Sequence, residues 1–186
     1  MSNQFDSNEE LHFSWYLDEL KSKGYIIEWS KVEKSFELTK GLYLNYKIPM
    51  KKVDDKIKQQ TILSPSVYTP DFYIIWSVKA FGIFTTDIDM DSDNKLDTPF
   101  ISRGKYSTVE VKGTFDNNNM TRLAVNNIKF VYDKFGVYVN LIKVPTIFDK
   151  TFTPDRYIMT DKSFKPRTIN YKNVRTLRGF VQSLSK

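Results

Sequence analysis

The chain has 186 residues, of which 40% are hydrophobic, 15% aromatic and 27% charged. These values are typical of one globular domain with its own hydrophobic core, and they exclude a chain that is disordered throughout. The absence of cysteine excludes disulfides, zinc–thiolate sites and thiol catalysis. The single histidine, His12, excludes metal sites built from several histidines.

No apolar run approaches the length of about 18 to 20 residues that a membrane-spanning helix needs. The first ten residues are polar and acidic, whereas a secretory signal peptide begins with basic residues followed by an apolar stretch. We therefore expect a cytoplasmic protein with no membrane association.

The basic residues are concentrated at the carboxyl end of the chain. The net charge is +6, and residues 162–186 hold seven Lys and Arg but no Asp or Glu, so the remainder of the chain is close to neutral. Such a segment attracts a polyphosphate and releases its counterions. A solvated extension is the alternative, although the interspersed Tyr171 and Phe180 favour a basic segment, 161–186, that docks on the domain.

The first predicted helix begins at the capping-box pattern Ser7-Asn8-Glu9-Glu10 and ends at Gly24. The segments 25–29, 36–38 and 42–46 are predicted to be short strands. Residues 51–60 are polar, which indicates an exposed linker or a short helix.

A strand is then predicted over 67–76, followed by a strand-like run at 78–84, an acidic loop at 87–97 and a strand at 107–111. Thr121 is expected to cap a second helix that ends at Gly136, and 137–144 has the β-branched composition of a buried strand. The order of helix, strands, helix and strand predicts an α/β layered domain around a mixed sheet, with an irregular basic tail.

Two short sequences carry candidate chemistry, Thr69-Pro70-Asp71-Phe72 and Val109-Glu110-Val111-Lys112-Gly113. In a strand, Glu110 and Lys112 lie on the same face because side chains alternate, while Val109 and Val111 point into apolar packing. If the two strands pair, two carboxylates and one ammonium group converge on one place.

Adjacent carboxylates are hard oxygen ligands of the kind that Mg²⁺ and Mn²⁺ prefer. Such an ion lowers the pKa of a bound water and stabilises charge at a phosphorus centre, which suits phosphodiester hydrolysis. The alternative is a cross-strand salt bridge at a sheet edge, worth about 0–1 kcal/mol if it is exposed.

The combination of Pro70-Asp71 with Glu110-Val111-Lys112 resembles the PD-(D/E)XK nuclease superfamily, and within it the small resolvase-like endonucleases of phages and mobile elements. The resemblance implies a restriction-endonuclease-like core of helix, three strands, helix and strand. It implies that Asp71, Glu110 and the Val111 carbonyl bind Mg²⁺, for which Mn²⁺ substitutes, and that Lys112 is the catalytic lysine. It also points to Glu10 as a further acidic residue of the site, with Glu9 as its substitute, although capping explains Glu10 equally well.

The two motifs lie 39 residues apart, which is wide for a direct hairpin. We therefore expect a nuclease domain over 1–160 with an insertion around 78–106, and the pairing of the two motif strands stays open at this point.

The expected function is a metal-dependent DNA endonuclease that processes phage or mobile-element DNA, including branched DNA, without an organic cofactor. The alternative is a catalytically silent nucleic-acid-binding or phage assembly protein on the same fold. Resolvase-like members act as homodimers, but the sequence shows no dimer interface. The residues predicted to contact DNA are polar or basic side chains of the second helix and the carboxyl-terminal segment: Arg122, Asn126, Lys129, Lys165, Arg167, Lys172, Arg175 and Arg178.

Overall fold

The computed structural model describes residues 5–50, 56–89, 98–113, 118–159 and 166–184. The helices are α1 (Asn8–Ser22), α2 (Asn118–Phe135), α3 (Val144–Lys150), α4 (Asp155–Ile158) and α5 (Leu177–Ser183), with a 3₁₀ turn η1 (Val78–Ala80). The strands are β1 (Ile26–Lys31), β2 (Phe36–Thr39), β3 (Leu42–Ile48), β4 (Lys56–Leu63), β5 (Ser66–Tyr68), β6 (Phe72–Trp76), β7 (Thr85–Asp87), β8 (Phe100–Ser102), β9 (Tyr106–Lys112) and β10 (Val139–Lys143). The protein is thus a mixed α/β structure with one four-stranded sheet and several small sheets.

The central sheet has the strand order β1-β6-β9-β10. β6 is antiparallel to both β1 and β9, whereas β9 and β10 are parallel, with α2 in the connection between them. The predicted mixed sheet is therefore confirmed. Phe72 pairs with Val109, so the long insertion between the two motif strands does not prevent them from lying side by side.

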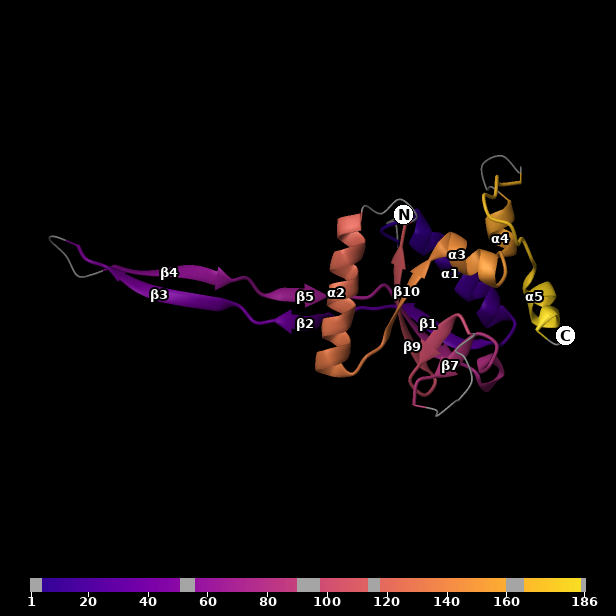
Figure 1. The fold of residues 1–186 in the computed structure, drawn as a ribbon, viewed down its shortest axis with the longest axis horizontal. Helices are drawn as coiled ribbons and strands as arrows, with labels where there is room; N and C mark the ends of the chain where they lie inside the picture. Colours follow the sequence, from indigo (N-terminus) through magenta and orange to yellow (C-terminus); the bar gives the residue numbers. More distant parts are fainter. Residues whose placement is uncertain (1–4, 51–55, 90–97, 114–117, 160–165, 185–186) are drawn as a thin grey trace.

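The two long helices lie on opposite faces of this sheet (Figure 1). The apolar face of α1, which includes Phe13, Leu17 and Leu20, is fully buried in the main core. Val109 and Val111 of β9 join the same core. A smaller cluster on the α2 side consists of Leu38, Tyr68, Val131 and Val139.

A long two-stranded extension leaves the body of the protein between β1 and β6 (Figure 1). β2 pairs with β5 at its base, and β3 pairs with β4 further out. The prediction of a linker or short helix over 51–60 is wrong for 56–60, which belong to β4; residues 51–55 lie outside the described residues. The predicted strand 67–76 is divided at Thr69-Pro70, because proline has no N–H to donate and the chain there passes from the extension into the central sheet.

The described parts of the insertion around 78–106 pack on the main core. The prediction of a strand over 78–84 is wrong, because the chain forms η1 and then turns at Gly82, whose φ of 75° suits glycine. Phe84 and Phe100 from this region are fully buried in the main core. Of the predicted acidic loop, Asp87 accepts hydrogen bonds from the backbone N–H groups of Asp89 and Gly104, and residues 90–97 lie outside the described residues.

The second helix begins at Asn118, so the prediction that Thr121 caps it is wrong. Asparagine favours helix starts as strongly as threonine, and the polar run before Thr121 therefore allows an earlier start. Gly136 ends the helix with a φ of 63°, as expected.

The carboxyl-terminal segment is partly helical rather than irregular. In α5, Leu177 and Phe180 are buried in the main core, and the Phe180 ring lies 5.5 Å from that of Phe84. Among the helices that the structure describes, none is both long and apolar enough to cross a membrane.

Candidate functional site

Asp71 is fixed where β6 meets its two neighbours. Its N–H donates to the Val109 carbonyl at 3.0 Å, and its carbonyl accepts from the N–H of Val32 at 3.1 Å. Its side-chain Oδ2 accepts from the N–H of Val111 at 2.7 Å. Pairing of β1, β6 and β9 therefore places this carboxylate at the carboxyl end of β9.

Glu110 and Lys112 lie on the same face of β9, as their spacing predicts, and their side chains form an ion pair of 2.8 Å. Only 6% of Glu110 is exposed. Its second carboxylate oxygen accepts a hydrogen bond of 2.9 Å from the hydroxyl of Tyr68, at the end of β5. Glu110 is therefore held on both sides.

The carboxyl groups of Asp71 and Glu110 repel one another. Burial and the nearby charge of Glu110 raise the pKa of Asp71 to about 7, and Glu10 adds to this effect. The Val111 N–H and the Lys31 ammonium oppose the shift without cancelling it. A proton or a divalent cation would relieve this repulsion.

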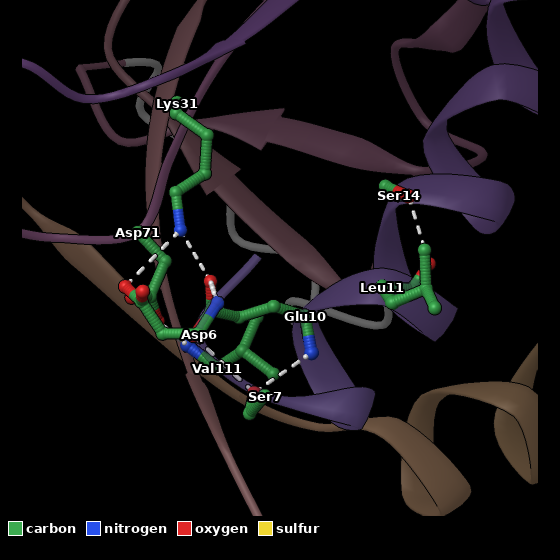
Figure 2. A network of polar contacts seen from close by, with 8 residues as sticks. All are labelled: Asp6, Ser7, Glu10, Leu11, Ser14, Lys31, Asp71 and Val111. Atoms are coloured by element: carbon green, nitrogen blue, oxygen red, sulfur yellow. Dashed lines mark hydrogen bonds and ion pairs between the residues drawn. The ribbon is translucent and has the colours of Figure 1, made fainter. Parts of the chain in front are cut away.

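Glu10 serves the helix cap and also faces the site (Figure 2). Its N–H donates to the Ser7 hydroxyl oxygen at 3.1 Å, and the hydroxyl donates back to its carboxylate at 3.2 Å. The other carboxylate oxygen pairs with Lys31, at the end of β1. Both interpretations of Glu10 therefore have a structural basis.

The residues surround an open cleft of about 310 Å³. Its lining comes from the amino end of α1 and from the ends of β6 and β9: Ser7, Glu9, Glu10, Asp71, Val111, Lys112 and Gly113. The Glu9 side chain lies close to Gly113: a β-carbon added to Gly113 would be 3.5 Å from the Oε1 atom of Glu9. Three acidic residues thus share one small cleft, with Glu110 buried beside it.

The donor set fits a divalent cation in chemistry, because Asp71 and Glu110 are neighbouring oxygen ligands whose repulsion such an ion would remove. Within the described residues, however, no three His, Asp or Glu side chains are arranged to hold a metal ion. The capping box and Lys31 both hold the carboxylate of Glu10, which lines the same cleft as Asp71.

Sequence reasoning did not identify two residues of this site, Tyr68 and Lys31. Tyr68 lies three positions before Asp71, and Lys31 pairs across the sheet with Phe72, directly after Asp71. The short sequence distance of Tyr68 from Asp71 was a usable signal. Nothing local marks Lys31, because only the pairing of β1 with β6 brings it to the cleft.

The predicted DNA contacts divide into exposed and occupied side chains. Arg122, Asn126 and Lys129 are exposed on α2, and Lys172 and Arg178 are exposed in the carboxyl-terminal segment. Lys165 lies outside the described residues.

Two arginines of the carboxyl-terminal segment are engaged within the chain. Arg167 lies 4.5 Å from the centre of the Tyr157 ring and donates to the Tyr157 carbonyl. Arg175 donates to the carbonyls of Asp149 and Lys150. Both therefore attach this segment to the body of the protein.

No protein-family model, no curated protein and no solved structure matches this chain.

Proposed function

We propose that the protein is a metal-dependent DNA endonuclease that uses Mg²⁺ or Mn²⁺. The observation that carries the proposal is the meeting of Asp71, Glu110 and Lys112 at the end of two paired strands, beside an open cleft. The sheet strands and long helices also follow the order α1, β1, β6, β9, α2, β10, which supports a restriction-endonuclease-like core. The proposed setting is the processing of phage or mobile-element DNA in the host cytoplasm.

In this proposal, Asp71 and Glu110, together with the Val111 carbonyl, hold the cation. The bound ion supplies Lewis acidity and a water of lowered pKa. The Val111 N–H orients the Asp71 carboxylate, and the Tyr68 hydroxyl orients that of Glu110. Because burial and the charge of Glu110 raise its pKa, Tyr68 stays protonated and remains a donor.

In this proposal, Lys112 provides positive charge beside the reacting phosphate. Its contact with Glu110 fixes the ammonium group at the edge of the cleft, where it orients the attacking water or a phosphate oxygen. The water oxygen bonds to phosphorus and releases a proton to solvent, while the bond from phosphorus to the 3′ oxygen breaks and that oxygen takes up a proton. The products then carry a 5′-phosphate and a 3′-hydroxyl group.

One observation favours a catalytically silent nucleic-acid-binding protein instead. Both carboxylate oxygens of Glu110 already have partners within the chain, Lys112 and Tyr68. If those contacts persist when metal is offered, the cluster stabilises the sheet and does not bind a cation.

Cleavage of plasmid and branched DNA with Mg²⁺ or Mn²⁺ tests the proposal. The wild type should nick DNA, and Glu110→Gln, which keeps the size of the side chain, should not. Glu28→Gln is a matched control, because Glu28 is an exposed glutamate of β1. Equal activity in wild type and Glu110→Gln would contradict the proposal, and DNA binding without cleavage in any sample would favour the silent protein.

A further inference from the structure

The two strands β3 and β4, here called the arm, stand clear of the rest of the protein (Figure 1). Every residue of β4 is exposed, and so is every residue of β3 except Ile48. Neither hydrophobic core contains a residue from the arm. The arm therefore adds nothing to the core, and its exposed faces are available to another molecule.

The side chains of the arm carry positive charge only. Lys47, Lys56 and Lys58 lie on its two strands, and these strands contain no Asp or Glu. Because the two strands themselves carry no carboxylate, their three ammonium groups favour a polyanionic partner. A second copy of the arm would bring like charges together.

The register of the arm places hydrogen-bonding side chains on both faces. Directly paired residues of antiparallel strands share a face, so Tyr46 and Lys58 lie on one face. Asn45 and Gln59 lie on the other. Amide and lysine side chains bond to base edges and phosphates, and apolar side chains contact the methyl group of thymine.

We propose that the arm inserts into the major groove of duplex DNA and holds the substrate beside the cleft. The major groove of B-DNA is about 12 Å wide and admits a two-stranded β-ribbon. This inference rests on the proposed function and adds to it the substrate class, a duplex that extends past the cleft.

The base of the arm is connected directly to the site. β5 closes the base by pairing with β2, and its last residue, Tyr68, donates to Glu110. A groove of about 560 Å³ lies next to this base, and Lys31, Lys34, Phe36 and Tyr73 are among the residues that line it. Lys31 lines this groove and also pairs with Glu10, so one side chain links the groove beside the arm to the cleft.

A single photo-crosslinker on the arm tests the contact. The chain has no cysteine, so Gln59→Cys creates one attachment point on β4, and Val78→Cys, which is 89% exposed in η1, is the control. Each labelled protein is mixed with duplex DNA in EDTA, where metal-dependent cleavage cannot occur. We expect the label at position 59 to capture DNA and the label at position 78 not to do so.

Three outcomes of this experiment would overturn the inference. Capture of a second protein chain by the label at position 59 would identify the arm as a self-association surface. Bound duplex with no capture at position 59 would place the DNA elsewhere. A labelled protein that does not bind duplex DNA at all would leave the arm without its proposed partner.

Removing the charge of the arm provides the second measurement. Replacing Lys47, Lys56 and Lys58 by Gln should weaken duplex binding. It should also make the negative slope of log K against log salt less steep, by about 0.9 for each phosphate that the variant no longer neutralises, or about 2.7 for three. The matched control replaces Lys21, Lys105 and Lys150, which are exposed lysines on the body, and should leave the slope nearly unchanged. An unchanged slope in the arm variant would contradict the inference.

The two proposals fail in different ways. DNA that crosslinks to the arm but is never cleaved by the wild type would remove the nuclease and leave the arm as a DNA-binding surface. If the wild type cleaves DNA but the arm variant keeps the salt slope of the wild type, the arm has no DNA-binding role and the nuclease proposal stands.

Discussion

The cleft and the arm hold their charges in opposite ways. Glu110 is 6% exposed, and both of its carboxylate oxygens have partners, whereas the lysines of the arm project into water from strands that are exposed on both faces. Buried charges interact strongly over short distances and shift one another's pKa, while exposed charges attract a polyanion from afar and are screened by salt. The comparison therefore predicts that chemistry and affinity can be changed separately.

The largest expected effect is at Lys112. Replacing it by Met should lower the rate of DNA cleavage by about 10²- to 10⁴-fold, the range for loss of a catalytic proton-transfer or charge-stabilising group. Duplex affinity measured in EDTA should change little, because one partly buried lysine neutralises few of the bound phosphates. If Lys112→Met lowers duplex affinity as strongly as it lowers the rate of cleavage, chemistry in the cleft and affinity at the arm are not separate.

The next effect in size is at Tyr68. Tyr68→Phe removes only the hydroxyl that bonds to Glu110, and it should lower metal affinity or cleavage by about 10- to 100-fold. Tyr138→Phe is the matched control, since Tyr138 is exposed and lies outside both the cleft and the arm. Calorimetric titration with Mn²⁺ separates loss of the metal from loss of chemistry. Equal Mn²⁺ affinity and equal cleavage in the Tyr68 variant would show that the hydroxyl does not position Glu110.

The pH dependence of stability tests the repulsion within the cleft. In metal-free protein, the carboxyl of Asp71 has a pKa of about 7, above its ordinary value of 3.8, so the folded state binds this proton more tightly than the unfolded state. Asp71 therefore lowers the free energy of unfolding as pH rises from about 4 to 7, by up to about 1.4 kcal/mol per pH unit.

Denaturant unfolding in EDTA across this range measures the effect. Asp71→Asn should be more stable than the wild type at pH 8 and should lose this advantage toward pH 4. Parallel curves for the two proteins would show that Asp71 has an ordinary pKa. The lysine variant of the arm should have the same free energy of unfolding as the wild type at every pH.

The smallest effect is expected in the carboxyl-terminal segment. Replacing Lys172 and Arg178 by Gln should reduce the steepness of the salt dependence of duplex binding by less than the arm variant does. Only two exposed charges are removed, and Arg167 and Arg175 are engaged within the chain. Salt titrations of both variants make the comparison direct. A larger fall than that of the arm variant would reverse their order as DNA-binding surfaces.

The arm shows why composition alone misled the sequence interpretation. A half-buried strand shows alternating polar and apolar residues, but both faces of the arm are exposed, so Lys56–Gln60 lacks that pattern and resembles a linker. The same reasoning worked in β6, where Phe72, Ile74 and Trp76 alternate into the core. The carboxyl-terminal segment is the converse case. Its charge predicted DNA contacts at Arg167 and Arg175, whereas both side chains are half-buried and donate hydrogen bonds within the chain.

The sequence by itself determined the local features of this protein. The capping box began α1 at the expected place, Gly136 ended α2, and the spacing of Glu110 and Lys112 placed them on one face of β9, because each of these depends on backbone geometry within a few residues. Only the tertiary structure decided that Asp71 lies against Val111, that Lys31 reaches the same cluster, and that β3 and β4 project as an arm. These features depend on pairing between strands far apart in the chain, which no local pattern of residues specifies.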